Sequence, residues 1–149
     1  MKKQMIGLVM IAFAWGVQTE AAEVTWQKDI KPIFDKQCAS CHSTGSPEHD
    51  EFSKDKKKWI DKSIGMRMDS YSLLVSYVGW PQTGALIRRL DDGSGKADKK
   101  AGNMYEHLGD TEAMRKANLD TFKAWVGNWN PKRWKDITKD ELNALKIKY

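Results

Sequence analysis

The stretch Cys38-Ala39-Ser40-Cys41-His42 constrains this chain more than any other part of its sequence. Its two thiols are three positions apart, and an imidazole follows the second thiol directly. This spacing is the signature of covalent c-type haem attachment, in which both thiols form thioethers with the haem vinyl groups. The histidine then becomes the proximal ligand of the iron. The motif predicts one haem c, held by Cys38 and Cys41, with His42 on the iron. A backbone carbonyl near Pro47 is expected to accept the Nδ1–H of His42, since a ligating histidine usually has such a partner.

Two other uses of the cysteines stay open at the level of sequence. The chain has two cysteines in all, and an exported protein can join such a pair in a disulfide. A redox-active Cys-x-x-Cys disulfide would be expected beside a βαβ pattern, which the chain lacks. A zinc site could recruit the motif together with His49, but structural zinc usually collects a second well-spaced ligand pair. Haem attachment also explains His42, which the disulfide does not.

Residues 1–21 have the pattern of a secretory signal peptide. Two lysines precede an apolar run from Met5 to Val17, and small residues follow up to Ala21. The run is too short for a permanent bilayer span. We therefore expect export to the periplasm and cleavage near Ala21, with membrane attachment only if the signal peptide remains in place.

Residues 22–149 are expected to form a single domain. Its core covers about 24–130, and a C-terminal extension covers about 131–149. Cleavage after Ala21 removes two lysines and one glutamate, which leaves 23 basic and 19 acidic side chains and changes the formal charge from +5 to +4. A charge excess of this size gives no support for nucleic-acid binding. It suits a monomer that meets redox partner proteins with acidic docking surfaces, because charge steers such encounters.

The mature chain has helical periodicity and no run of alternating apolar and polar residues, so the predicted fold class is all-α. Asp29 is expected to cap the first helix, which ends at the haem motif. Thr138 and Glu141 form a capping-box pattern at the start of the last helix, which is expected to end near Ile147. The remaining helices are expected over 52–60, 70–78, 86–90 and 110–129.

The second axial ligand decides what a haem held by His42 can do. A thioether saturates the iron and raises its potential, whereas an open position permits ligand binding or peroxide chemistry. Met104 precedes a long amphipathic helix in a polar loop that offers little reason for core packing, so it is the predicted ligand. Met68, in a turn, and His107, three residues after Met104, are the reserve candidates.

The chain resembles the class I monohaem c-type cytochromes. The residues that carry the resemblance are Asp29 to His42 and Gly102 to Trp129, with the order helix, Cys-x-x-Cys-His, intervening helices, methionine loop and long C-terminal helix. In that family the N-terminal and C-terminal helices cross, and the methionine ahead of the last core helix ligates the iron. The resemblance implies these roles for Cys38, Cys41, His42 and Met104.

The sequence departs from that family at several points. Tyr105 stands where many members have proline, 61 residues separate His42 from Met104, and Pro131 to Tyr149 extends beyond the family core.

The resemblance implies a one-electron carrier between redox proteins and no enzymatic activity. The alternatives are a haem subunit of a larger oxidoreductase, docked through the extension with its Trp129 and Trp134, and a ligand-binding or peroxidase-like protein with an open sixth position. Candidate partners for the haem propionates are Arg67, Arg88 and Trp80.

Overall fold

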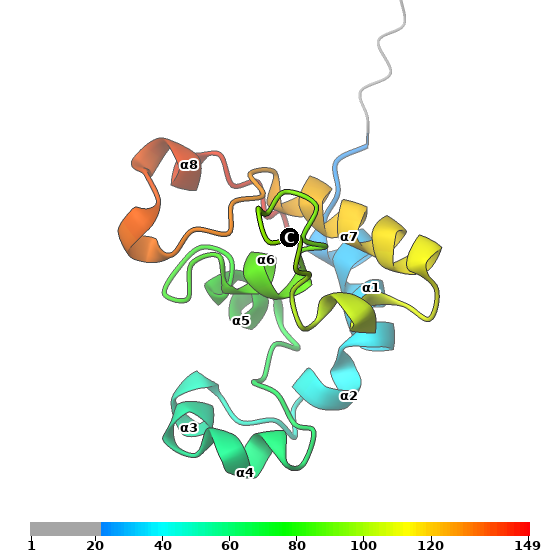
Figure 1. Ribbon diagram of the computed structural model, residues 1–149, viewed down its shortest axis with the longest axis vertical. Coiled ribbons are helices and arrows are strands. Elements are labelled where there is room, and N and C mark those ends of the chain that lie inside the picture. The colour runs from blue at the N-terminus through cyan, green and yellow to red at the C-terminus, as the bar shows by residue number, and fades with distance from the viewer. Residues whose placement is uncertain (1–21) are drawn as a thin grey trace, which may run out of the picture.

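The computed structural model describes residues 22–149, and the predicted signal peptide lies outside this range. The described residues form the predicted all-helical fold, without strands. Within this part of the chain, no helix combines the length and apolar character needed to cross a bilayer. The elements in chain order (Figure 1) are η1 (Trp26–Ile30), α1 (Lys31–Gln37), α2 (Ala39–His42), α3 (His49–Lys54), α4 (Lys56–Ile60), α5 (Tyr71–Ser76), α6 (Ala85–Leu90), η2 (Tyr105–Leu108), α7 (Glu112–Val126), η3 (Trp134–Asp136) and α8 (Lys139–Asn143).

The N-terminal helical arm, which consists of η1 and α1, begins earlier than the sequence predicts. Thr25 caps η1, because its hydroxyl accepts a hydrogen bond from the Lys28 N–H at 3.3 Å. Asp29, the predicted cap, already lies inside the helical turn, where its carboxylate accepts from the Thr25 N–H at 2.8 Å. The prediction of Asp29 as the cap was therefore wrong, because Thr25 takes that position and Asp29 instead holds the Thr25 N–H from within the first turn. Pro32 lies in the first turn of α1, where its missing N–H breaks no intrahelical bond.

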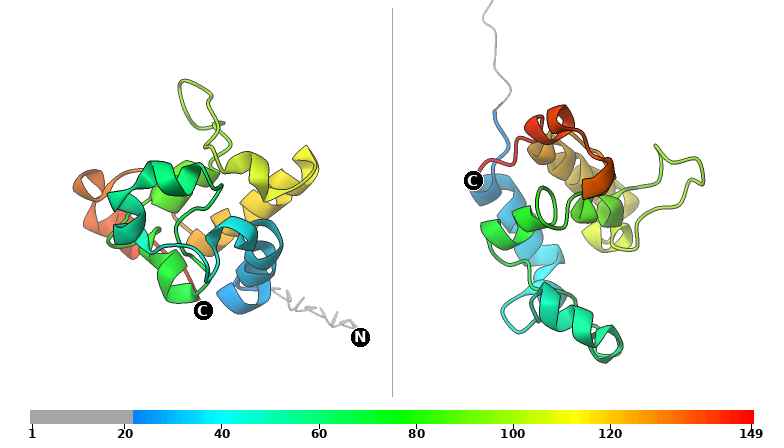
Figure 2. Two further views of the ribbon diagram at one scale, coloured as in Figure 1. Left: turned by 90° about the horizontal axis from the view of Figure 1, so that it is seen from below. Right: turned by 90° about the vertical axis from the view of Figure 1, so that its left-hand side faces the viewer.

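The N-terminal arm crosses α7, the longest helix, as two views of the ribbon show (Figures 1 and 2). Thr111 caps α7 by accepting from the Met114 N–H. At the crossing, the ring centroids of Trp26 and Trp125 are 6.4 Å apart. Burial of this apolar surface supplies most of the stability expected at the crossing. The fully buried residues of α7 are Leu119, Phe122, Trp125 and Val126.

α7 ends at Val126, three residues before the predicted end. Gly127 follows with a φ of 78°, in a region of backbone space that suits glycine and terminates the helix. Trp129 therefore lies outside the helix, and its indole N–H donates to the carboxylate of Asp91 at 3.0 Å. This hydrogen bond satisfies a buried acid and ties the chain after α7 to the end of α6.

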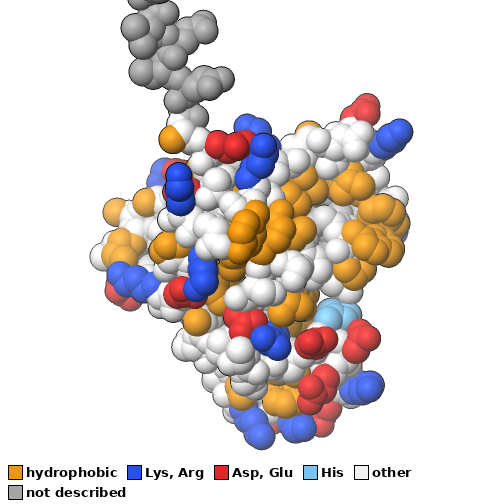
Figure 3. Space-filling model, turned by 180° about the vertical axis from the view of Figure 1, so that it is seen from behind, with side chains coloured by type: hydrophobic (Ala, Val, Ile, Leu, Met, Phe, Trp, Pro, Cys, Tyr) orange, Lys and Arg blue, Asp and Glu red, His pale blue; other side chains and the backbone are white. Residues whose placement is uncertain are grey.

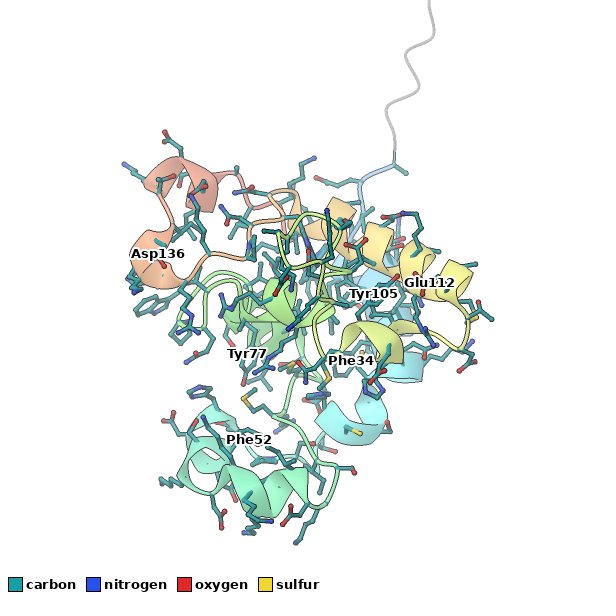
Figure 4. The ribbon with its side chains drawn as sticks, viewed as in Figure 1. Phe34, Phe52, Tyr77, Tyr105, Glu112 and Asp136 are labelled. Carbon is teal, nitrogen blue, oxygen red and sulfur yellow. The ribbon has the colours of Figure 1, made fainter. Side chains whose placement is uncertain are left out.

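Residues 43–64 form a small lobe that projects from the rest of the described chain, which we call the main lobe (Figures 1 and 2). The small lobe contains α3 and α4, where one continuous helix was predicted. Asp55 interrupts the helix with φ −146° and ψ 71°, and its carboxylate accepts from the Lys58 N–H to cap α4. The short helices place Phe52 on the side of the lobe that faces the main lobe (Figure 4).

The C-terminal extension wraps back onto the crossing of the two main helices. The predicted capping box of Thr138 and Glu141 is present, although α8 ends at Asn143 and not near Ile147. After α8 the tail runs along the core, where the Lys148 carbonyl accepts from the Trp26 backbone N–H and the Trp125 indole N–H, both at 2.8 Å. The extension is thus part of the packed fold.

Glu141 is the electrostatic centre of the extension. It accepts from the Lys132 ammonium at 2.8 Å, from the Asn130 amide at 2.6 Å and from the Thr138 N–H at 2.9 Å. The Lys132 hydrogen bond, followed by the Thr138 N–H, lowers the pKa of Glu141 to about 2. The carboxylate therefore stays ionised, and keeps these bonds, through the whole neutral range.

Candidate functional site

His42 sits at the C-terminal end of α2, where the preceding helical arm delivers it to the junction of the two lobes. Its Nδ1 lies 2.6 Å from the backbone oxygen of Met66. A carbonyl oxygen only accepts, so Nδ1 carries the proton and Nε2 keeps a free lone pair. Burial lowers the pKa of His42, a charge on His107 would act in the same direction, and the bond to Met66 opposes both. The result is a neutral imidazole with one oriented nitrogen that can bind a metal.

The segment 65–68 runs alongside the haem motif through backbone hydrogen bonds. The Gly65 N–H donates to the Cys41 carbonyl at 2.8 Å, and the Met68 N–H donates to the His42 carbonyl at 2.9 Å. We expected the carbonyl that accepts from His42 to lie near Pro47. That expectation was wrong, because the Pro47 carbonyl accepts instead from the Arg67 N–H at 2.8 Å.

Gly65 lies directly against the imidazole of His42. A Cβ at this position would stand 2.1 Å from Cε1 of the ring and 2.6 Å from Nδ1. Real Cβ atoms do not approach other atoms so closely, so only glycine lets the chain pass here with the ring in place. Sequence reasoning did not single out Gly65, since one glycine in a turn carries no sign of a distant contact.

The two thiols flank the start of α2 and His42, with Cys38 just before the helix and Cys41 directly before the histidine. Cys38 ends α1 and Cys41 lies within α2, and both are free and partly buried. Burial, and then the charge of Cys41, raise the pKa of the Cys38 thiol to about 11. The thiols are not joined as a disulfide in the structure, and no cluster of three or more His, Cys, Asp or Glu among residues 22–149 could hold a metal ion by itself.

A cavity of about 1150 Å³ opens between the small lobe and the main lobe. Cys38, Cys41 and His42 border it. Figure 4 shows the labelled Phe34 and Tyr77 on the main-lobe side and Phe52 on the small-lobe side. The other apolar residues that line the cavity are Ile60, Ile64, Met66, Met68, Leu74, Ala85, Leu86, Leu90, Ala101, Met104, Leu108 and Phe122.

η2 brings both main candidates for a sixth ligand to this cavity. The Met104 N–H donates to the Arg89 carbonyl of α6 at 2.9 Å, and the Tyr105 hydroxyl donates to Glu112 of α7 at 2.6 Å (Figure 4). Three residues make one turn of a 3₁₀ helix, so His107 follows Met104 on the same side. Both residues line the cavity, Met104 half-buried and His107 largely exposed.

Of the three candidates for the haem propionates, Arg88 borders the cavity. Arg67 does not border it and forms an ion pair with Asp69 at 2.8 Å. Trp80 also lies away from the cavity and stacks edge-on against Trp134, with the ring centroids 4.5 Å apart.

The cavity and its residues fit a haem c. Two thiols border it for thioether formation, a neutral imidazole offers a free nitrogen, and an apolar lining excludes water from a flat macrocycle. The all-helical fold around this site is that of a monohaem c-type cytochrome, with a single covalently bound haem c.

Comparisons with known proteins give the family. Residues 25–149 match the model of the family described as PccH cytochrome c, and the chain therefore belongs to that family. The chain is also similar to a solved structure, that of the monoheme cytochrome PccH from Geobacter sulfurreducens. The two are 60% identical with a TM-score of 0.80, over 85% of this chain and 99% of that one. A search of the curated proteins found no match.

We predict that replacing Gly65 with alanine displaces the His42 ring, because the new Cβ would overlap it. The free energy of unfolding of the haem-loaded protein should fall by about 1–3 kcal/mol, the usual cost of an added methyl in a packed site. Denaturant unfolding, together with the haem absorption spectrum, measures the effect.

Gly45→Ala is the matched control, since nothing lies within 4 Å of a Cβ there. It should change the unfolding free energy by less than about 0.5 kcal/mol. Equal effects of the two substitutions would show that Gly65 does not confine the imidazole.

Proposed function

We propose that this protein is a one-electron carrier in which Cys38 and Cys41 hold the haem and His42 and Met104 bind its iron. The observation that carries the proposal is the placement of His42 and Met104 on separate supports around one cavity. His42 is fixed by the segment 65–68, whereas Met104 is fixed by α6. Membership of a monohaem cytochrome family supports electron transfer as the function.

The role of the chain is to hold the site unchanged while an electron arrives and leaves. A bound haem supplies the ferrous/ferric couple. The Nδ1–H of His42 donates a hydrogen bond to the Met66 carbonyl. This bond fixes the ring and makes Nε2 more basic, so that it binds iron more strongly. The apolar lining keeps water away, so little solvent has to reorganise when the charge changes.

Met104 is favoured over Met66 and Met68 by the way their backbones are held. The backbones of Met66 and Met68 both bond directly to His42, one as an acceptor and one as a donor. The segment that carries them would therefore lie on the His42 side of a bound haem, whereas a sixth ligand must come from the other face. Met104 starts from η2, which bonds to α6 and packs on α7.

Met104→Ala tests the sixth ligand. The ferric sulfur-to-iron charge-transfer band should disappear, and the ferrous protein should begin to bind carbon monoxide. Met114→Ala, in α7 and away from the cavity, should keep the band. A band that survives in Met104→Ala and is lost in Met68→Ala would contradict the assignment. A wild-type protein that binds carbon monoxide readily would favour the ligand-binding or peroxidase-like alternative.

We propose that the protein works in the periplasm after removal of residues 1–21. The support is the sequence of that segment, with its lysines, apolar run and small residues. The periplasmic fraction should contain a haem protein whose mass lacks this segment. A full-length protein in the membrane fraction would instead show that the signal remains as an anchor.

We propose that its partners are redox proteins with acidic docking surfaces and that the carrier itself is a monomer. The support for acidic partners is the formal charge of +4 that remains once residues 1–21 are removed. Electron transfer to a small acidic redox protein should slow as ionic strength rises, because salt screens the attraction. A rate that does not change with salt would contradict the charge-steered encounter.

The docking of the chain as a subunit through Trp129 has less support. The indole N–H of Trp129 donates to the Asp91 carboxylate, so it is engaged within this chain. Trp134 is about half exposed and packs on Trp80, and Figure 3 shows apolar atoms gathered at the edge of the molecule that carries the extension. An exposed aromatic pair of this kind suits transient docking as well as a permanent interface.

A further inference from the structure

The charge of the cavity wall is entirely of one sign. No aspartate or glutamate of the described residues borders the cavity, whereas five cationic side chains do. An apolar cavity surrounded by unopposed cations suits a ligand that is flat, apolar and anionic at one edge. These cations are Lys56, Arg88, Arg89, Lys96 and Arg133.

Arg88 joins the cavity to the C-terminal extension. Its Nη1 donates to the carbonyls of Thr83 and Pro131, both at 3.0 Å, and of Lys132 at 3.1 Å. These acceptors are neutral, so the positive charge of the guanidinium is left without a counter-charge. Gly84, with a φ of 65°, permits this approach, since a Cβ there would stand 2.3 Å from the Lys132 carbonyl.

Arg133 follows these carbonyls directly, so the bonds to Arg88 set its position at the edge of the cavity. It has no aspartate or glutamate within 4.0 Å among the described residues, whereas its neighbour Lys132 pairs with Glu141 at 2.8 Å. Burial lowers the pKa of Arg88, and the charge of Arg133 lowers it further, so the two guanidinium groups repel each other.

Two like charges held together at a cavity edge need an anion to offset their repulsion. Arg89 also borders the cavity, but one of its guanidinium donors is already used, because its Nη1 donates to the Asn103 side chain at 2.7 Å. Guanidinium groups bind carboxylates well, through two parallel hydrogen bonds. The haem c of this protein brings two carboxylates on the edge away from its vinyl groups.

We propose that Arg133 of the C-terminal extension, together with Arg88 of α6, binds a propionate carboxylate of the haem. The extension is then part of the haem pocket, and its cation helps to set the reduction potential. The proposal requires the haem and its site in this cavity, and it does not depend on the electron-carrier function or on the sixth ligand.

Arg133→Gln in the haem-loaded protein tests the proposal. Removing the cation leaves the propionate charge unopposed, which favours the ferric state, so the reduction potential should fall. The propionate bending band in the resonance Raman spectrum should also shift, because that carboxylate loses a hydrogen-bond donor. Arg133→Lys keeps the charge and should restore most of the potential but not the Raman band.

Lys135→Gln is the matched control, because it removes the same charge from the same extension at an exposed position that does not border the cavity. It should leave both the potential and the Raman band unchanged. If Arg133→Gln and Lys135→Gln behave alike, the proposal is wrong.

A carboxylate of a partner protein is the other possible anion for Arg133. In that case Arg133→Gln would slow electron transfer to an acidic partner while the potential and Raman band of the isolated protein stayed as in the wild type. That result would also overturn the proposal, since it assigns Arg133 to docking.

Discussion

The hydrogen bond from His42 Nδ1 to the Met66 carbonyl is the interaction on which the site depends. It fixes the tautomer, leaves Nε2 free to bind the iron and ties the haem motif to a segment 24 residues further along the chain. The bond needs Gly65 beside it, because any side chain there would occupy the space of the ring. The segment between motif and acceptor is the small lobe, so the same contact that orients the ligand also closes the loop that forms one wall of the cavity.

The rest of the fold keeps the main-lobe wall in position. The crossing of the N-terminal arm with α7 buries Trp26 against Trp125, and the C-terminal tail covers this crossing by bonding to both residues through the Lys148 carbonyl. Arg88 holds the start of the extension against α6. The extension therefore stabilises the scaffold at its end and reaches the cavity at its beginning.

The features that could be predicted from the sequence depend on local chemistry. The haem motif, the helix starts near Ser70 and Thr111, the capping box at Thr138 and the buried face of α7 each follow from residues a few positions apart. The features of the site that were missed depend on contacts between distant residues. The acceptor for His42, the need for Gly65 and the position of Arg133 arise only when the chain folds back. The early end of α7 was missed for a different reason, since Gly127 was a local signal that the apolar spacing out to Trp129 obscured.

The central claim is that His42 and Met104 face each other across one haem, and nuclear magnetic resonance of the ferrous protein tests it most directly. A methionine methyl bound to the iron is shifted strongly upfield by the porphyrin ring current. We predict one such methyl, with nuclear Overhauser contacts to Leu108 of η2, which borders the cavity beside Met104. An upfield methyl in contact with residues 64–68 instead, or the absence of any such methyl, would contradict the account.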